Sequence, residues 1–216
     1  MNIELIVFDF DGILADTSKH VINCIKKCIK RFNLKELAQE NIKIINDSDL
    51  SDIFVSLGTE SSNIEQIKEY YNEIFMKELS DISLYDGVFE TLCALKENRM
   101  LLAIASSRDK KTLFQLLWNL GILEMFDEII CESDVNRKKP KPDMANLLLE
   151  EMNITPEQTL IVGNTNCDIQ MGKNANCKTG LIIYPEGPQT NIKYKPDYIM
   201  TKFDDILKIS LPRKVL

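Results

Sequence analysis

Two carboxylates after an apolar run are the residues of this chain whose types and spacing most clearly allow chemistry. The run Ile3–Phe8 is largely apolar and rich in branched side chains, which predicts a buried strand, and Asp9, Asp11 and Gly12 follow it. A buried carboxylate is costly unless its charge is compensated. Two of them this close need a cation, a shared proton or a reaction to perform. The alternative is a strand that ends in a solvated acidic turn.

Polar side chains also follow three later strand-like runs, which are Leu101–Ala105, Glu128–Cys131 and Thr159–Val162. In an open parallel sheet, ligands bind beyond the carboxyl ends of the strands. If these strands are neighbours, their polar groups converge on one crevice. The groups are Ser106, Ser107 and Arg108 after the first run, Lys139 beyond the second, and Asn164 and Asp168 after the third.

This set of side chains suits phosphoryl transfer. A carboxylate can attack phosphorus and form an acyl phosphate, while a second carboxylic acid protonates the leaving oxygen and later deprotonates water. A lysine and a hydroxyl can hold the phosphoryl oxygens, and Mg²⁺ can screen the repulsion between the anions. Each residue alone has an ordinary explanation as well. Ser106 could cap the next helix, Lys139 could lie in a solvated loop, and Asp168 could be an acid in the first turn of a helix.

The elements that must position these groups alternate between strands and helices. Two further strands are expected at Thr179–Ile183 and Asp197–Met200. The alternation predicts an α/β fold, with a Rossmann-like parallel sheet covered by helices on both faces. Helices are expected at Gly87–Glu97, Lys110–Leu120, Asp143–Met152, Asp168–Asn174 and Phe203–Ile209.

One interval breaks the alternation. Residues 17–82 show helical periodicity and no convincing strand, which predicts an all-helical cap inserted after the first strand. Residues 1–16 and 83–216 would then form the α/β core. The cap is Lys-rich in its first part and acidic in its second, and both patterns are typical of solvated helix faces.

Composition narrows the possible functions. The 216 residues carry a net charge of −7, which argues against a nucleic-acid scaffold, and no run approaches the length of a membrane span. The start of the chain does not have the pattern of a signal peptide. The six cysteines form no C-x-x-C pair, so a zinc site is not expected, and free thiols suit the cytoplasm. Cys24 and Cys28 are expected to be buried small hydrophobes.

Four motifs in order give the chain a resemblance to a known family, the haloacid dehalogenase-like hydrolases. It resembles the branch that includes phosphoglycolate phosphatases and beta-phosphoglucomutases, and the resemblance spans nearly the whole chain. The motifs are Asp9–Thr17 for the first, Ser106 for the second, Lys139–Asp143 for the third, and Gly163–Asp168 where G-D-x-x-x-D is expected.

The resemblance implies a role for each matched residue. Asp9 would be the nucleophile and a Mg²⁺ ligand, and Asp11 the acid/base, with its backbone carbonyl also on the metal. Ser106 and Lys139 would bind the transferring phosphoryl group, and Asp168 would orient the metal's ligands. Thr17 would begin the first cap helix. Because the family's dehalogenases lack the second aspartate, Asp11 implies phosphate esters as substrates.

Three departures from the family pattern limit the prediction. Asn164 replaces a metal-binding aspartate, so Mg²⁺ binding should be weak. His20 is one place too early for the mutase-like histidine; it could still reach the cleft, but a surface position is expected for it. The segment Ile45–Leu50 offers no basic residue for a second anionic group, which makes Arg108 the nearest candidate, although a surface salt bridge is its commoner role.

The sequence therefore predicts a cytoplasmic, Mg²⁺-dependent phosphatase that acts on a small phosphorylated metabolite, similar to phosphoglycolate phosphatase. No nucleic-acid or membrane partner is expected, and the chain could be a monomer or a dimer. A catalytically degenerate protein that binds a phosphorylated ligand or a protein partner is one alternative, motivated by Asn164. A phosphosugar mutase is the other.

Overall fold

A computed structural model of the chain describes residues 3–37, 50–79, 82–185 and 192–211. Its centre is a six-stranded sheet with the strand order β3-β2-β1-β4-β5-β6, and all the strand pairs are parallel. The strands are β1 (Leu5–Phe8), β2 (Leu101–Ser106), β3 (Glu128–Cys131), β4 (Thr159–Gly163), β5 (Lys178–Ile182) and β6 (Tyr198–Met200). The predicted α/β fold is confirmed, with strand ends shifted by at most one or two residues.

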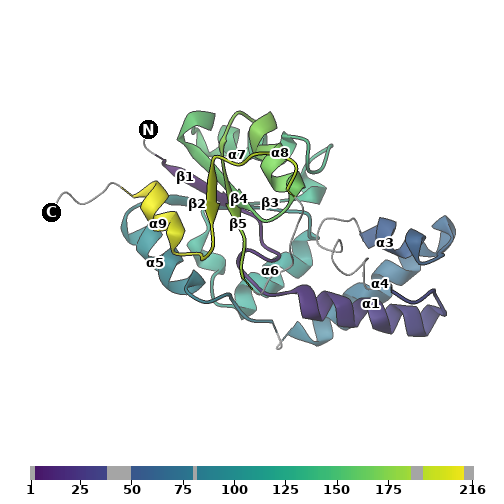
Figure 1. Cartoon of the computed structure of the whole chain (residues 1–216). Helices are drawn as coiled ribbons and strands as arrows, with labels where there is room; N and C mark the ends of the chain where they lie inside the picture. The colour runs from purple at the N-terminus through teal and green to yellow at the C-terminus, as the bar shows by residue number, and fades with distance from the viewer. Residues whose placement is uncertain (1–2, 38–49, 80–81, 186–191, 212–216) are drawn as a thin grey trace.

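Helices cover both faces of the sheet. Helices α7 and α8 lie on one side, and α5, α6 and α9 lie on the other (Figure 1). Short 3₁₀ turns complete the connections at Leu123–Met125, Glu132–Asp134 and Pro156–Gln158. The helices are α5 (Val88–Glu97), α6 (Lys110–Asn119), α7 (Asp143–Met152), α8 (Asn166–Asn174) and α9 (Asp205–Ser210).

Alternate residues of each central strand enter different apolar clusters. In β1, Leu5 and Val7 pack with residues of α7 and α8, whereas Ile6 and Phe8 pack with those of α5, α6 and α9. Side chains of a strand point alternately to its two faces, so a strand buried on both sides must be apolar throughout. This burial explains the continuous apolar run that precedes Asp9.

Among the described residues, three of the helices between β1 and β2 form a layer of their own beside the sheet, which we call the helical cap (Figure 1). They are α1 (Ser18–Phe32), α3 (Leu50–Ser56) and α4 (Ile64–Lys77), and a 3₁₀ turn at Ser61–Asn63 precedes α4. Helix α4 packs against both α1 and α3. None of the described helices is long and apolar enough to span a membrane.

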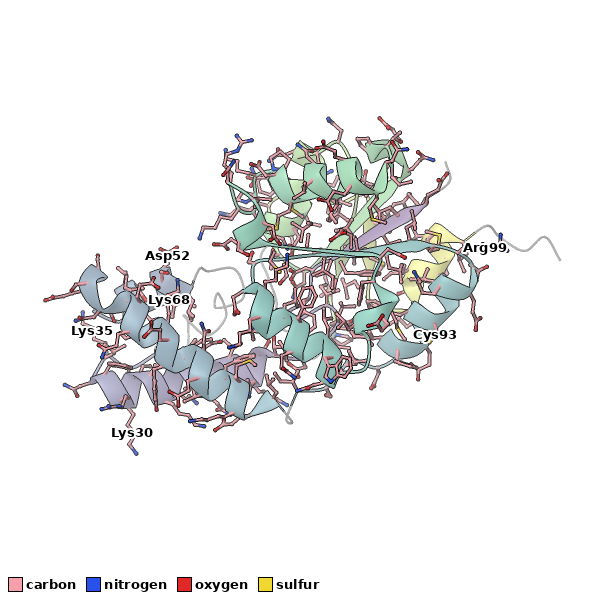
Figure 2. All side chains as sticks on the ribbon, turned by 180° about the vertical axis from the view of Figure 1, so that it is seen from behind. Lys30, Lys35, Asp52, Lys68, Cys93 and Arg99 are labelled. Carbon is pink, nitrogen blue, oxygen red and sulfur yellow. The ribbon has the colours of Figure 1, made fainter. Side chains whose placement is uncertain are left out.

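The apolar interior of the helical cap is continuous with that of the sheet. Ile25, Phe54 and Phe75 of the cap belong to the same buried cluster as Phe8 and Phe203 of the core. Cys24 and Cys28 are buried free thiols in this cluster, as expected from their spacing. The exposed lysines Lys30 and Lys35 project away from the core, as predicted for a solvated helix face (Figure 2).

Two short segments join the helical cap to the core. They pair at an antiparallel bridge between Ala15 and Leu84, flanked by hydrogen bonds from Asp16 N to Ser83 O and from Tyr85 N to Leu14 O. Tyr184, which follows β5, stacks on Tyr85 and donates its hydroxyl to Ile13 O at 2.8 Å. The predicted division at residues 16/17 and 82/83 coincides with this double connection, and as a domain boundary it stays a prediction.

Candidate active site

Lys139 joins two buried carboxylates at the carboxyl edge of the sheet. Its Nζ lies 2.8 Å from Asp9 Oδ1 and 2.7 Å from Asp168 Oδ1. The exposed fractions of the three side chains are 5% for Lys139, 12% for Asp9 and 2% for Asp168. Asp9 is held at this edge of the sheet because its amide donates to Val162 O of the neighbouring strand β4. The solvated-loop explanation for Lys139 is therefore wrong.

The electrostatics of this cluster follow from its burial. The pKa of Asp9 is raised to about 7, because the increase caused by burial and by the charges of Asp168 and Asp11 outweighs the decrease caused by the Lys139 ammonium. Burial alone would lower the pKa of Lys139, but the charges of Asp168 and Asp9 hold it above its ordinary value. Lys139 therefore stays protonated and supplies the positive charge that keeps Asp9 able to ionise near neutral pH.

Asp168 is fixed at the start of helix α8. Its Oδ2 accepts hydrogen bonds from the amide and the hydroxyl of Thr165, at 3.1 and 2.7 Å, and Thr165 Oγ1 accepts from Asp168 N in return. This reciprocal arrangement is a capping box. Gly163 makes room for it, since a Cβ at that position would lie 2.2 Å from Asp168 Cβ. Asp168 is thus both the early helical acid and the group that positions Lys139.

Asp11 points to the helical cap and is held there by two residues. Arg108 donates from Nε to Asp11 Oδ2 at 3.1 Å and from Nη2 to Asp11 Oδ1 at 2.5 Å. The hydroxyl of Thr17 also donates to Asp11 Oδ1 at 2.5 Å. The guanidinium carbon of Arg108 lies 4.4 Å from the centre of the Phe75 ring on α4. A surface salt bridge is therefore the wrong description of Arg108, whose side chain is only 10% exposed.

The two serines after β2 have different surroundings. Ser106 is buried, and its Oγ accepts a hydrogen bond from Arg108 N at 3.2 Å. It does not cap the next helix, because Asp109 is the N-cap residue of α6 and accepts from Thr112 N. Ser107 is exposed and lines the cleft described below. The register of β2 on β1 places Ser106 at the same sheet edge as Asp9.

Asn164 carries a feature that fits a cation. Its Oδ1 is buried and accepts no hydrogen bond, while its Nδ2 lies 3.4 Å from Gly12 O. An orphaned buried oxygen is costly, and oxygen ligands are those that Mg²⁺ prefers. Within the described residues, no three His, Cys, Asp or Glu side chains are placed to hold a metal. The donor set therefore fits Mg²⁺ only if Asn164 and backbone carbonyls complete it beside Asp9.

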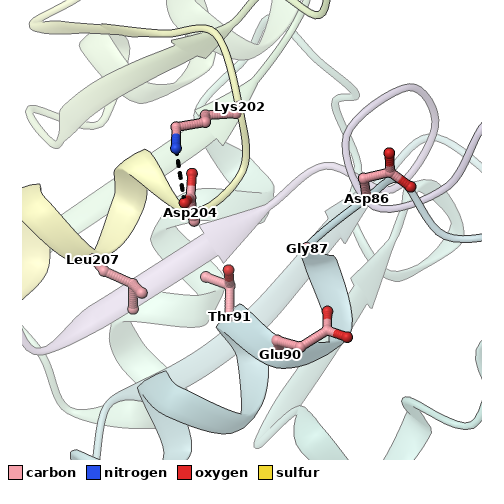
Figure 3. A pocket seen from close by; sticks show the side chains of 7 residues that line it. All are labelled: Asp86, Gly87, Glu90, Thr91, Lys202, Asp204 and Leu207. Carbon is pink, nitrogen blue, oxygen red and sulfur yellow. Dashed lines mark hydrogen bonds and ion pairs between the residues drawn. The ribbon is translucent and has the colours of Figure 1, made fainter.

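A cleft of about 430 Å³ opens between the core and the helical cap. Its volume is in the range of small-molecule sites. The core contributes Asp11, Ser107, Arg108, Asp109, Glu132 and Ser133, Thr17 lies at the start of α1, and the cap helices contribute Val21, Leu50, Ile53, Lys68, Tyr71 and Asn72. A second hollow, of about 470 Å³, lies between α5 and α9 and contains none of the predicted site residues (Figure 3).

The expected surface position of His20 is wrong. The residue is 6% exposed, its ring packs edge-on against Phe75 at 4.5 Å, and its Nε2 lies 3.1 Å from Phe75 O. It is a residue of the cap interior and does not line the cleft. The segment Ile45–Leu50 was predicted to offer no basic residue for a second anionic group of the substrate. Apart from Leu50, this segment lies outside the described residues.

Two contacts of the site, the capping box of Thr165 with Asp168 and the pairing of Arg108 with Asp11, were not predicted from the sequence. The capping box had a local signal in the Thr165-x-x-Asp168 spacing. The pairing of Arg108 with Asp11 joins positions 97 residues apart and had no local signal. Lys68 was not singled out from the sequence, and only the packing of α4 beside the core shows that it lines the cleft.

Comparison with known proteins identifies the family. The model of the haloacid dehalogenase-like hydrolases matches residues 6–182. Pyrophosphatase PpaX from Listeria innocua is 28% identical over 210 residues, which cover 96% of each chain. A predicted phosphoglycolate phosphatase from Haemophilus somnus is 28% identical, with a TM-score of 0.86 over 97% of this chain and 99% of that one.

A haloacid dehalogenase-like family hydrolase from Streptococcus pneumoniae shares the fold, with a TM-score of 0.83 and 23% identity over 96% of this chain and 98% of that chain. The match of the family model to most of the chain confirms the resemblance seen in the four motifs. The chain therefore belongs to the family of haloacid dehalogenase-like hydrolases and is an enzyme of the phosphatase type.

Proposed function

We propose that the enzyme is a Mg²⁺-dependent phosphatase that hydrolyses a small phosphomonoester through an aspartyl phosphate on Asp9, similar to phosphoglycolate phosphatase. The observation that carries the proposal is the buried contact of Lys139 with both Asp9 and Asp168. A buried lysine between two carboxylates offers a cation at the point where a phosphoryl group must approach an anionic nucleophile.

The proposed reaction has two displacements. An oxygen of Asp9 attacks phosphorus and forms an acyl phosphate as the bond from phosphorus to the leaving oxygen breaks. Asp11 gives a proton to that leaving oxygen. It then takes a proton from water, whose oxygen attacks phosphorus and frees Asp9. Lys139 and the hydroxyl of Ser106 hold the phosphoryl oxygens, and Ser107 and Arg108 bind the rest of the substrate.

Mg²⁺ would supply charge neutralisation between nucleophile and phosphate. Asp9, the backbone carbonyl of Asp11 and the amide oxygen of Asn164 would hold it. Asp168 Oδ1 already accepts a hydrogen bond from Lys139, and Asp168 Oδ2 accepts two from Thr165. Asp168 would therefore orient the groups around the metal and would not itself bind it. The absence of a charge at Asn164 supports a requirement for high Mg²⁺ concentrations.

The acceptor in this proposal is water. The histidine that would assist transfer to a sugar hydroxyl has no counterpart at the cleft, since His20 is buried in the helical cap. The free state of all six cysteines suits a cytoplasmic enzyme. The names of the relatives add inorganic pyrophosphate and phosphoglycolate to the substrates to be tried.

Release of inorganic phosphate from a panel of small phosphorylated metabolites tests the proposal. The wild type should turn over at least one of them with Mg²⁺, and Asp9→Asn should reduce the rate by several orders of magnitude. The matched control is Asp16→Asn, which makes the same substitution in the connection to the helical cap. Binding without turnover in the wild type would favour a phospho-ligand-binding protein and contradict the phosphatase.

A further inference from the structure

The cleft between the core and the helical cap has a basic group on each wall. Arg108 follows β2 on the core side, and Lys68 belongs to α4 on the cap side. Tyr71 and Asn72, three and four residues further along α4, line the same wall, because residues at these spacings share a helix face. Figure 2 shows Lys68 on the side of the cap opposite to Lys30.

The charge of Lys68 is only weakly compensated within the protein. Its Nζ lies 3.4 Å from Glu65 Oε1, and the Glu65 side chain is 80% exposed to solvent. A pair of this kind contributes little and exchanges readily. The other carboxylates of the cleft have partners: Asp109 accepts from Thr112 N, and Glu132 pairs with Lys138 at 2.9 Å.

Arg108 is hydrogen-bonded to Asp11, the carboxylate that the proposed reaction needs as its acid/base. Through Nε and Nη2 it binds both oxygens of Asp11, so Asp11 cannot exchange a proton with a leaving group in this arrangement. The guanidinium lies on the Phe75 ring of the cap, within the cleft that also contains Lys68. A second anion in the cleft would compete directly with Asp11 for Arg108.

We propose that the substrate carries a second anionic group, that Lys68 and Arg108 bind this group from opposite walls of the cleft, and that its binding draws Arg108 away from Asp11. This inference rests on the proposed phosphatase function and specifies its substrate class. The class comprises small molecules in which a carboxylate or a second phosphate lies close to the scissile phosphoryl group. Such a substrate releases the acid/base residue as it binds.

Two substrates of nearly equal size test the subsite. 2-Phosphoglycolate carries a carboxylate where 2-hydroxyethyl phosphate carries a neutral hydroxymethyl group, and pyrophosphate carries a second phosphate. Wild-type kcat/KM should be higher for the two compounds that carry a second anionic group than for 2-hydroxyethyl phosphate. Lys68→Gln and Arg108→Gln should each lower the ratio of kcat/KM for 2-phosphoglycolate over 2-hydroxyethyl phosphate by about 10- to 100-fold. Pyrophosphate in place of 2-phosphoglycolate shows whether the second group is a phosphate or a carboxylate.

Lys77→Gln is the matched control. Lys77 lies on the same helix, pairs with Glu73 at 2.6 Å, and does not line the cleft. Its ratio should stay within about 2-fold of the wild-type ratio, as expected for a change to an exposed ion pair. A fall in both rates with no change in the ratio for Lys68→Gln would mean a general structural role and would overturn the subsite.

Binding in the Asp9→Asn background separates the subsite from the reaction. Calorimetry should show tighter binding of 2-phosphoglycolate than of 2-hydroxyethyl phosphate, and Lys68→Gln should remove the difference. If this pattern holds while the wild type turns over neither compound, the subsite stands and the proposed phosphatase function fails. Equal binding of the two compounds would refute the subsite. A crystal structure with 2-phosphoglycolate in which Arg108 keeps both bonds to Asp11 would refute the exchange.

Discussion

Removal of the Lys139 ammonium should leave two buried carboxylates facing each other. In Lys139→Gln, Asp9 and Asp168 lose a cation that lies 2.8 and 2.7 Å from their oxygens. Loss of one partner of a buried ion pair costs about 3–5 kcal/mol of unfolding free energy. The cost should stay in this range rather than double, because Asp9 can take up a proton once its counter-charge is gone.

The pH dependence of this cost has a definite sign. The pKa of Asp9 is already raised to about 7 in the folded protein, and without the Lys139 ammonium that lowers it, it should rise further above the value of the unfolded chain. The destabilisation is therefore full above this folded-state pKa of Asp9 and shrinks as the pH falls through it. Urea unfolding followed by circular dichroism in EDTA should show a larger loss at about pH 8 than at about pH 5.5.

Lys138→Gln is the control for this experiment. Lys138 precedes Lys139 directly, and its side chain is 52% exposed and paired with Glu132. Its substitution should cost about 0–1 kcal/mol and should leave phosphate release nearly unchanged. Lys139→Gln should also reduce that release by about 10²–10³-fold. Equal stability losses in the two variants would refute the buried contact on which the proposed function depends.

Three further changes have defined outcomes. Asn164→Asp adds a second carboxylate, besides Asp9, to the proposed metal site and places it beside Gly12 O. The Tm of this variant should be below that of the wild type in EDTA and should rise more when MgCl₂ is added. Equal increases in the Tm of the two proteins with MgCl₂ would contradict the metal site. Tyr184→Phe should cost about 1–3 kcal/mol in urea unfolding, because Ile13 O loses its donor; no cost would show that water replaces it. Burial alone would raise the pKa of Asp197, but bonds from Thr179 lower it, so Asp197→Asn should reduce Tm at neutral pH, and the deficit should vanish as the pH falls through that lowered pKa.

The sheet and its edge were predictable because their signals are local. A strand buried on both faces must be a continuous apolar run, and the polar residues after β1, β2 and β4 are adjacent to such runs in the sequence. The order of the motifs then sufficed to predict that Asp9, Lys139 and Asp168 meet.

The wall of the cleft that belongs to the helical cap was not predictable in the same way. Lys68 and His20 both belong to amphipathic helices, and which of their polar residues turn inward depends on how α1 and α4 pack. His20 is buried because Phe75 offers it both a ring face and a carbonyl oxygen. Neither contact is visible in the spacing of residues along a single helix.

The apolar cluster that the helical cap and the core share determines how the protein unfolds. Phe54 and Phe75 are packed in one cluster with Phe8 and Phe203. Unfolding of the helical cap would therefore expose apolar side chains of the sheet to solvent. Heating should therefore produce a single calorimetric transition whose van't Hoff and measured enthalpies agree. A fragment that contains only the helical cap would expose a large apolar surface and should aggregate. The helical cap should therefore be stably folded only together with the core.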